Sequence, residues 1–141
     1  MSVPSESSRS NDQARLAMHY EEVFALSWDL VEQSYLSALG QPSWKHFEPV
    51  LELVREMRRR GYDRLFRAGH ALYSLVLSRS AEHGLRREQP FVQIFVWPWA
   101  QDMRMRVSCG PGEHKLFVEE SFALTPALER VLADLARAPI D

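Results

Sequence analysis

Five histidines are the first candidates for chemistry, because imidazole titrates near neutral pH and is the commonest metal ligand in proteins. They are His19, His46, His70, His83 and His114. No two of them stand three or four residues apart, the spacing that would place two imidazoles on one face of a helix. We therefore expect structural or surface histidines, and we predict neither a metal site nor a cofactor.

The single cysteine, Cys109, precedes a glycine turn, and the nearest cation in the sequence is Arg106. No histidine or other base stands beside it, so a small buried side chain is the better interpretation than a nucleophile. One cysteine also excludes an intramolecular disulfide and a cysteine-based zinc site. No nucleophile-elbow or phosphate-loop motif occurs. The sequence favours a non-catalytic protein, and a small enzyme with a site of unrecognised type is one alternative.

Arginines dominate the middle of the chain. Residues 55–106 carry a charge of +6, whereas residues 11–54 carry −5 and residues 107–141 carry −3. The candidate binding residues in this segment are Arg58, Arg59, Arg64 and Arg67. Guanidinium groups bind phosphate and carboxylate through paired hydrogen bonds, so their convergence would favour nucleic acid or an acidic partner.

The same arginines have carboxylates within helical reach. Glu52, Glu56 and Asp63 stand at spacings that place them beside the arginines on the predicted helices. Internal pairing would leave a mixed, solvated surface, and this is the interpretation that we favour.

A second candidate surface lies on the predicted sheet, where side chains alternate between the two faces. One face is apolar, and we expect the other to mix aromatic and basic side chains. The residues of this predicted surface are Phe95, Trp97, Arg104, Arg106, Lys115 and Phe117, with Trp99 in the following loop. This composition suits the stacking of nucleic-acid bases and also suits a protein interface. We favour burial within the protein or against a partner.

Three helices are predicted before the sheet. The first spans 10–40, from a capping box at Ser10 to Gly40, and its apolar stripe is widened by Leu26, Trp28 and Leu30, which indicates packing partners on two sides. The second spans 49–60 with a proline in its first turn, and the third spans 63–84 on the strength of three-and-four apolar spacing.

The hydrophobic period then changes from that of a helix to that of strands. Strands are predicted at 91–97, 103–109 and 113–119, and a final helix follows an N-cap at Thr125. The predicted fold class is therefore α+β, with three N-terminal helices, a three-stranded antiparallel meander and a C-terminal helix in two layers. We expect a disordered tail at 1–10 and a single domain at 11–141.

The ordinary balance of 45% hydrophobic and 26% charged residues indicates a globular protein. The single cysteine predicts a cytoplasmic location, and the polar first ten residues predict neither a secretory signal nor a membrane partner. The favoured function is a protein-binding or regulatory module whose partner is another protein or a second copy of itself. A nucleic-acid-binding protein is the main alternative.

A titration with labelled duplex oligonucleotide at about 50 mM salt separates these two functions, because phosphate contacts are least screened there. We expect no binding at tens of micromolar protein. Binding that weakens steeply with salt, and less steeply after Arg58 and Arg59 are both replaced by alanine, would instead support the nucleic-acid alternative.

Overall fold

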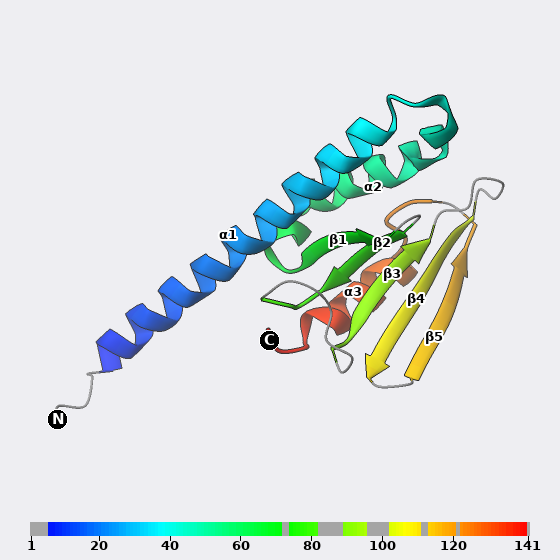
Figure 1. Cartoon of the computed structure of the whole chain (residues 1–141). Helices are drawn as coiled ribbons and strands as arrows, with labels where there is room; N and C mark the ends of the chain where they lie inside the picture. Colours follow the sequence, from blue (N-terminus) through cyan, green and yellow to red (C-terminus); the bar gives the residue numbers. More distant parts are fainter. Residues whose placement is uncertain are drawn as a thin grey trace.

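The computed structural model describes residues 6–71, 74–81, 89–95, 102–110, 113–120 and 122–140. Its helices are α1 (Glu6–Ala38), α2 (Glu48–Arg59) and α3 (Pro126–Ala136), with short 3-10 turns at Pro42–Phe47 and Tyr62–Arg64. Its strands are β1 (Arg67–Ala71), β2 (Ser74–Ser78), β3 (Phe91–Phe95), β4 (Met103–Gly110) and β5 (Glu113–Glu119). The α+β class is confirmed, but the sheet has five antiparallel strands in the order β1-β2-β3-β4-β5, so the prediction of three was wrong (Figure 1).

The first two helices follow the sequence closely. α1 begins at Glu6, before the capping box predicted at Ser10, because helical geometry continues through the serine-rich stretch. α2 carries its proline in the first turn, as predicted. Gly61 follows α2 with a φ of 84°, a left-handed conformation that glycine adopts without steric cost. Gly40, where the first helix was predicted to end, lies just beyond α1 and does not have a positive φ.

The third predicted helix, at 63–84, is absent, and its described residues form a short turn followed by the β1–β2 hairpin. Asp63 therefore lies in a 3-10 turn and does not cap a helix. Leu75 and Leu77 are both fully buried, and Val76 between them is only partly buried and projects to the opposite face, as the two-residue period of a strand requires. A short apolar run of this kind is compatible with either a helix or a strand, and here the pairing of β2 with β1 and β3 selects the strand.

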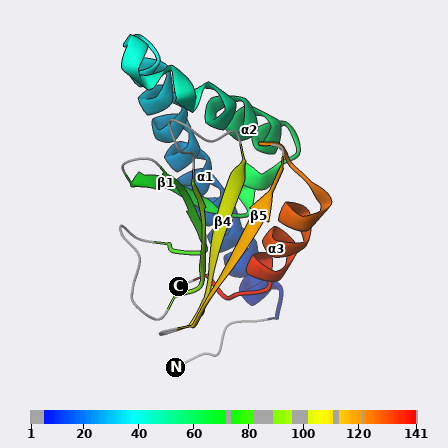
Figure 2. The ribbon, with the colours of Figure 1, turned by 90° about the vertical axis from the view of Figure 1, so that its right-hand side faces the viewer.

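One face of the sheet holds the core. Side chains of Leu77, Val92, Ile94, Met103 and Met105 are fully buried on this face. They pack with apolar residues of α2 and α3 in one hydrophobic cluster. Both helices lie on the same side of the sheet, and among the described residues no helix covers the other side, which we call the helix-free face (Figure 2).

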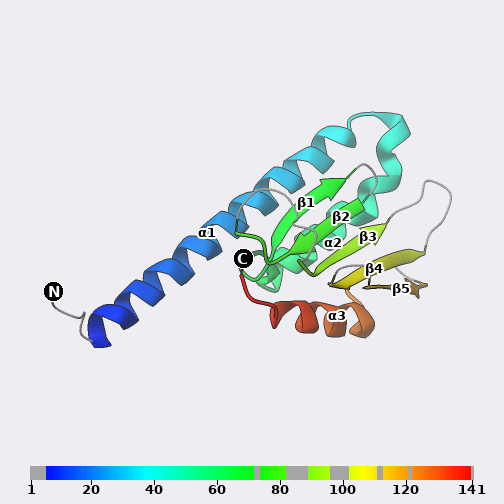
Figure 3. The ribbon, with the colours of Figure 1, turned by 60° about the horizontal axis from the view of Figure 1, so that its bottom comes forward.

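The last helix forms after Thr125, as predicted, and docks on the core face. The hydroxyl of Thr125 accepts a hydrogen bond from the backbone amide of Leu128 at 3.2 Å, which caps the helix N-terminus. Leu128, Leu132 and Leu135 are buried and lie on one side of α3, beneath the sheet in Figure 3.

α1 covers the outer edge of β1. The indole Nε1 of Trp28 donates a hydrogen bond to the carbonyl of Phe66 at 2.8 Å, and the hydroxyl of Ser27 accepts one from the amide of Ala68 at 2.9 Å. An unpaired strand edge leaves backbone groups without partners, and these two side chains satisfy groups that a neighbouring strand would otherwise pair. The helix therefore covers this edge of the sheet, where another strand could otherwise pair with β1.

Replacing Ser27 by alanine should lower the free energy of unfolding by about 1–3 kcal/mol, because the buried amide of Ala68 would lose its acceptor. Urea denaturation measures this change. Ser34→Ala is the matched control, since Ser34 is exposed on the same helix. Equal stability of the Ser27 and Ser34 variants would contradict the role assigned to the edge hydrogen bond.

Candidate functional site

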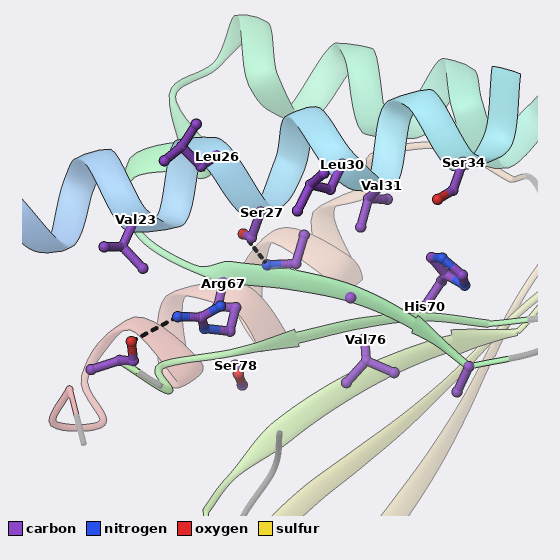
Figure 4. Close-up of a pocket in the computed structure, with 14 residues that line it drawn as sticks. Val23, Leu26, Ser27, Leu30, Val31, Ser34, Arg67, His70, Val76 and Ser78 are labelled. Carbon is purple, nitrogen blue, oxygen red and sulfur yellow. Dashed lines mark hydrogen bonds between the residues drawn. The ribbon is translucent and has the colours of Figure 1, made fainter. Parts of the chain in front are cut away.

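A groove of about 980 Å³ runs between α1 and the helix-free face at β1 and β2. Its α1 wall is formed mainly by Val23, Leu26 and Leu30, and its floor includes Gly69 and Val76 (Figure 4). The groove forms because α1 lies along the edge of the sheet and extends above the plane of its helix-free face. Gly69 has open space where a Cβ would be, so the floor is low at this point.

The α1 wall of the groove is apolar and solvent-accessible. The exposed fraction is 61% for Leu26 and 68% for Leu30, whereas Trp28 between them is fully buried. The helix thus has two apolar stripes: an inner one packed on the domain and an outer one facing solvent. The sequence predicted packing partners on two sides of this helix. Within the described residues the inner stripe has such partners, and the outer stripe is exposed.

The polar groups of the groove are mostly committed to the fold. The hydroxyl of Ser27 also donates to the carbonyl of Phe24 at 2.6 Å, in addition to accepting from the amide of Ala68. The guanidinium of Arg67 donates to the carbonyls of Ser80 and Ala81, each at 2.7 Å. Burial lowers the pKa of Arg67 from its usual range. Because its guanidinium bonds to these backbone carbonyls, it stabilises the end of the β1–β2 hairpin. The groove is therefore suited to apolar contact.

A buried tyrosine lies near one end of the groove. The ring of Tyr35 on α1 contacts the ring of the groove-lining His70, with 6.1 Å between their centroids. The hydroxyl of Tyr35 is buried without a hydrogen-bond partner among the described residues. Burial raises the pKa of Tyr35 well above its usual range, so the phenol stays protonated at neutral pH.

The predicted arginine surface is largely neutralised. Arg58 reaches carboxylate oxygens of Asp29 at 2.6 Å, Glu32 at 3.2 Å and Asp63 at 3.5 Å. Arg55 also pairs with Glu32, at 3.3 Å. Burial opposes the charge of Arg58, but the hydrogen bond and the negative charges of these carboxylates raise its pKa overall. These pairs join α2 to α1.

The neighbouring arginines are engaged in the same way. Arg59 and Arg60 both hydrogen-bond to Glu56 and lower its pKa, and Arg60 also pairs with Glu129 of α3. Arg64 is exposed and makes no ion pair within the described part of the chain. The four arginines predicted to bind an anion thus have different surroundings, and the structure does not bring them together as one free basic surface.

The aromatic and basic surface predicted on the sheet is divided between its two faces. Directly paired residues of antiparallel strands project to the same side, and Arg104 pairs with Phe95 and Val118. Phe95, Arg104 and Arg106 therefore lie on the helix-free face.

Lys115 and Phe117 pair with Val107 and Met105, so they project to the opposite, core side. The register of β5, which shifts near Gly110, is responsible for this difference. Trp97 and Trp99 lie outside the described residues.

The described residues contain no group of three or more His, Cys, Asp or Glu side chains placed to hold a metal ion. Within the same part of the chain, no helix has both the length and the apolar character needed to cross a bilayer. Comparison with protein-family models, with curated proteins and with solved structures gave no match.

Tyr35→Phe should leave the protein as stable or up to about 1 kcal/mol more stable at pH 7, because it removes a buried hydroxyl without a partner. The folded state also keeps the proton that the unfolded chain releases above about pH 10, so stability should fall as the pH rises beyond that value. The variant should lose less stability than the wild type between pH 7 and pH 11, by roughly 1 kcal/mol. Urea denaturation at both pH values tests this, and an equal loss in the two proteins would contradict it.

Proposed function

We propose that this protein is a non-catalytic protein-binding module, and that its interface is the outer stripe of α1 together with the adjoining groove. The observation that carries the proposal is the exposure of Leu26 and Leu30 at 61% and 68% beside a groove of about 980 Å³. Contiguous apolar surface of this kind is costly to keep in water and is characteristic of interaction sites.

The chemistry of the groove supports binding over catalysis. A catalytic site needs a base, nucleophile or charge-stabilising group aimed at the substrate. Here the hydroxyl of Ser27 and the guanidinium of Arg67 are already bonded to the backbone of the protein itself. The groove therefore offers shape and apolar contact, with polar groups that support its walls.

The ion pairs support a protein partner over nucleic acid. Binding to the phosphate backbone depends on several unpaired cations acting together. Arg58 instead touches three carboxylates, and Arg59 and Arg60 share Glu56. The arginines of α2 thus form ion pairs within the domain and are less available to bind phosphate groups.

The proposal predicts that Leu26→Glu combined with Leu30→Glu abolishes partner binding without unfolding the protein, because both side chains are exposed. Proteins that co-purify with the tagged wild-type chain from the producing cells should be depleted at least about tenfold with the double variant. Thermal denaturation of the purified variants checks that each remains folded.

Leu116→Glu is the matched control, since Leu116 is 64% exposed but lies on β5 at the far edge of the sheet. This variant should retain the partners. Partners that survive the double substitution on α1, or that are lost with the substitution on β5, would overturn the proposal.

A further inference from the structure

The N-terminal half of α1 projects beyond the rest of the domain (Figures 1 and 3). Every residue from 11 to 19 is exposed, and from residue 11 onward the first buried side chain is that of Phe24. Leu16 and Met18 on this projecting part are 51% and 61% exposed. An isolated helix of about 12–15 residues is only marginally stable in water, so a projecting segment of this length needs a surface to pack on.

Leu16 extends the outer stripe from the groove onto the projecting half at the spacing of a coiled-coil seam, and the d positions on that half are the polar residues Asp12 and His19. Leu16, Val23 and Leu30 are seven residues apart, and Leu26 follows Val23 by three. These are the a and d positions of a heptad repeat, the pattern by which two helices pack side by side. The inner stripe, which includes Phe24, Trp28, Val31 and Tyr35, is a separate set packed within the domain.

We propose that the occupant of the groove is the projecting half of α1 from a second copy of this chain, paired antiparallel in a two-fold symmetric dimer. This inference rests on the proposed function, because it names the partner for the same interface. Each copy supplies one projecting half-helix and one groove, so a single symmetric contact covers both exposed features of both copies.

Heptad packing in this orientation sets the register. It places Leu16 of one copy beside Leu26 of the other, Val23 beside His19, and Leu30 beside Asp12 at the end of the seam, because a positions of one helix meet d positions of its antiparallel partner. In a parallel pair both sheets would lie at the same end of the dimer. Each groove would then face the folded domain of the other copy and not its projecting helix.

Charge complementarity supports the antiparallel direction. Flanking positions of the seam bring the exposed Arg15 of one copy toward Asp29 of the other. Asp29 belongs to a cluster in which three carboxylates share two guanidiniums, so one negative charge is left over there. Arg15 supplies the matching positive charge.

Sedimentation equilibrium on the full chain tests the dimer. The wild type should show about twice the monomer mass of 16.3 kDa at micromolar concentration. Leu26→Glu with Leu30→Glu should weaken the dimer at least about a hundredfold, because the contact would bury unpaired carboxylates. Leu116→Glu should remain a dimer. A dimer lost with Leu116→Glu but kept by the double variant would move the interface to the free edge of β5 and overturn the inference.

Disulfide cross-linking tests the orientation. In a Cys109→Ser background, chains carrying Leu16→Cys and chains carrying Leu26→Cys are mixed and oxidised. The antiparallel register predicts mixed disulfides between the two variants, because equivalent positions would lie about 15 Å apart along the helices, too far for a disulfide. Disulfides that form mainly within each variant would show a parallel pair and overturn the inference.

The two proposals fail in different ways. A wild-type chain that stays monomeric at all concentrations, while other proteins bind it and are lost with the double α1 variant, would overturn the dimer and leave the protein-binding function intact. Self-association and partner binding that both ignore the double variant would overturn both proposals.

Discussion

The position of α1 against the edge of β1 determines most of what is distinctive about this protein. Trp28 and Ser27 satisfy backbone groups at that edge, so the helix is held beside the sheet and does not lie across it. Two features follow from this one placement. The helix stands as a wall next to the helix-free face, which creates the groove, and only one of its two apolar stripes can reach the core. The exposed leucines are a consequence of how the edge is covered.

The basic middle of the chain illustrates how charge is used within the fold. α1 and α2 are connected through Arg58, which bridges Asp29 and Glu32, and the acidic flank of the sequence thereby neutralises its basic segment. Such partly exposed pairs contribute little stability individually, but a shared cluster orients the two helices. Packing of the helices thus pairs part of the basic segment with acidic side chains, and the apolar groove is left as the more informative feature.

Sequence patterns predicted the elements whose local signals agree with one another. α2, with its early proline and the left-handed Gly61, and α3, with its Thr125 cap, formed as expected because capping and helical period point to the same structure. The segment from Arg67 to Ser78 was mispredicted because its apolar residues satisfy both periods. Gly69 was a signal against the helix, since glycine inside a helix costs about 1 kcal/mol relative to alanine.

The sequence by itself determined the α+β composition, the helices α2 and α3, the position of β5 and the unusually wide apolar surface of the first helix. Tertiary structure alone decided which leucines of that helix remain exposed, because this depends on the direction from which the edge of β1 approaches. It also decided that Lys115 and Phe117 lie on the opposite face from Arg104, because alternation along β5 defines two faces but only pairing with β4 assigns them. Local patterns specify periods and caps, whereas the choice of face is made by contacts between residues distant in the chain.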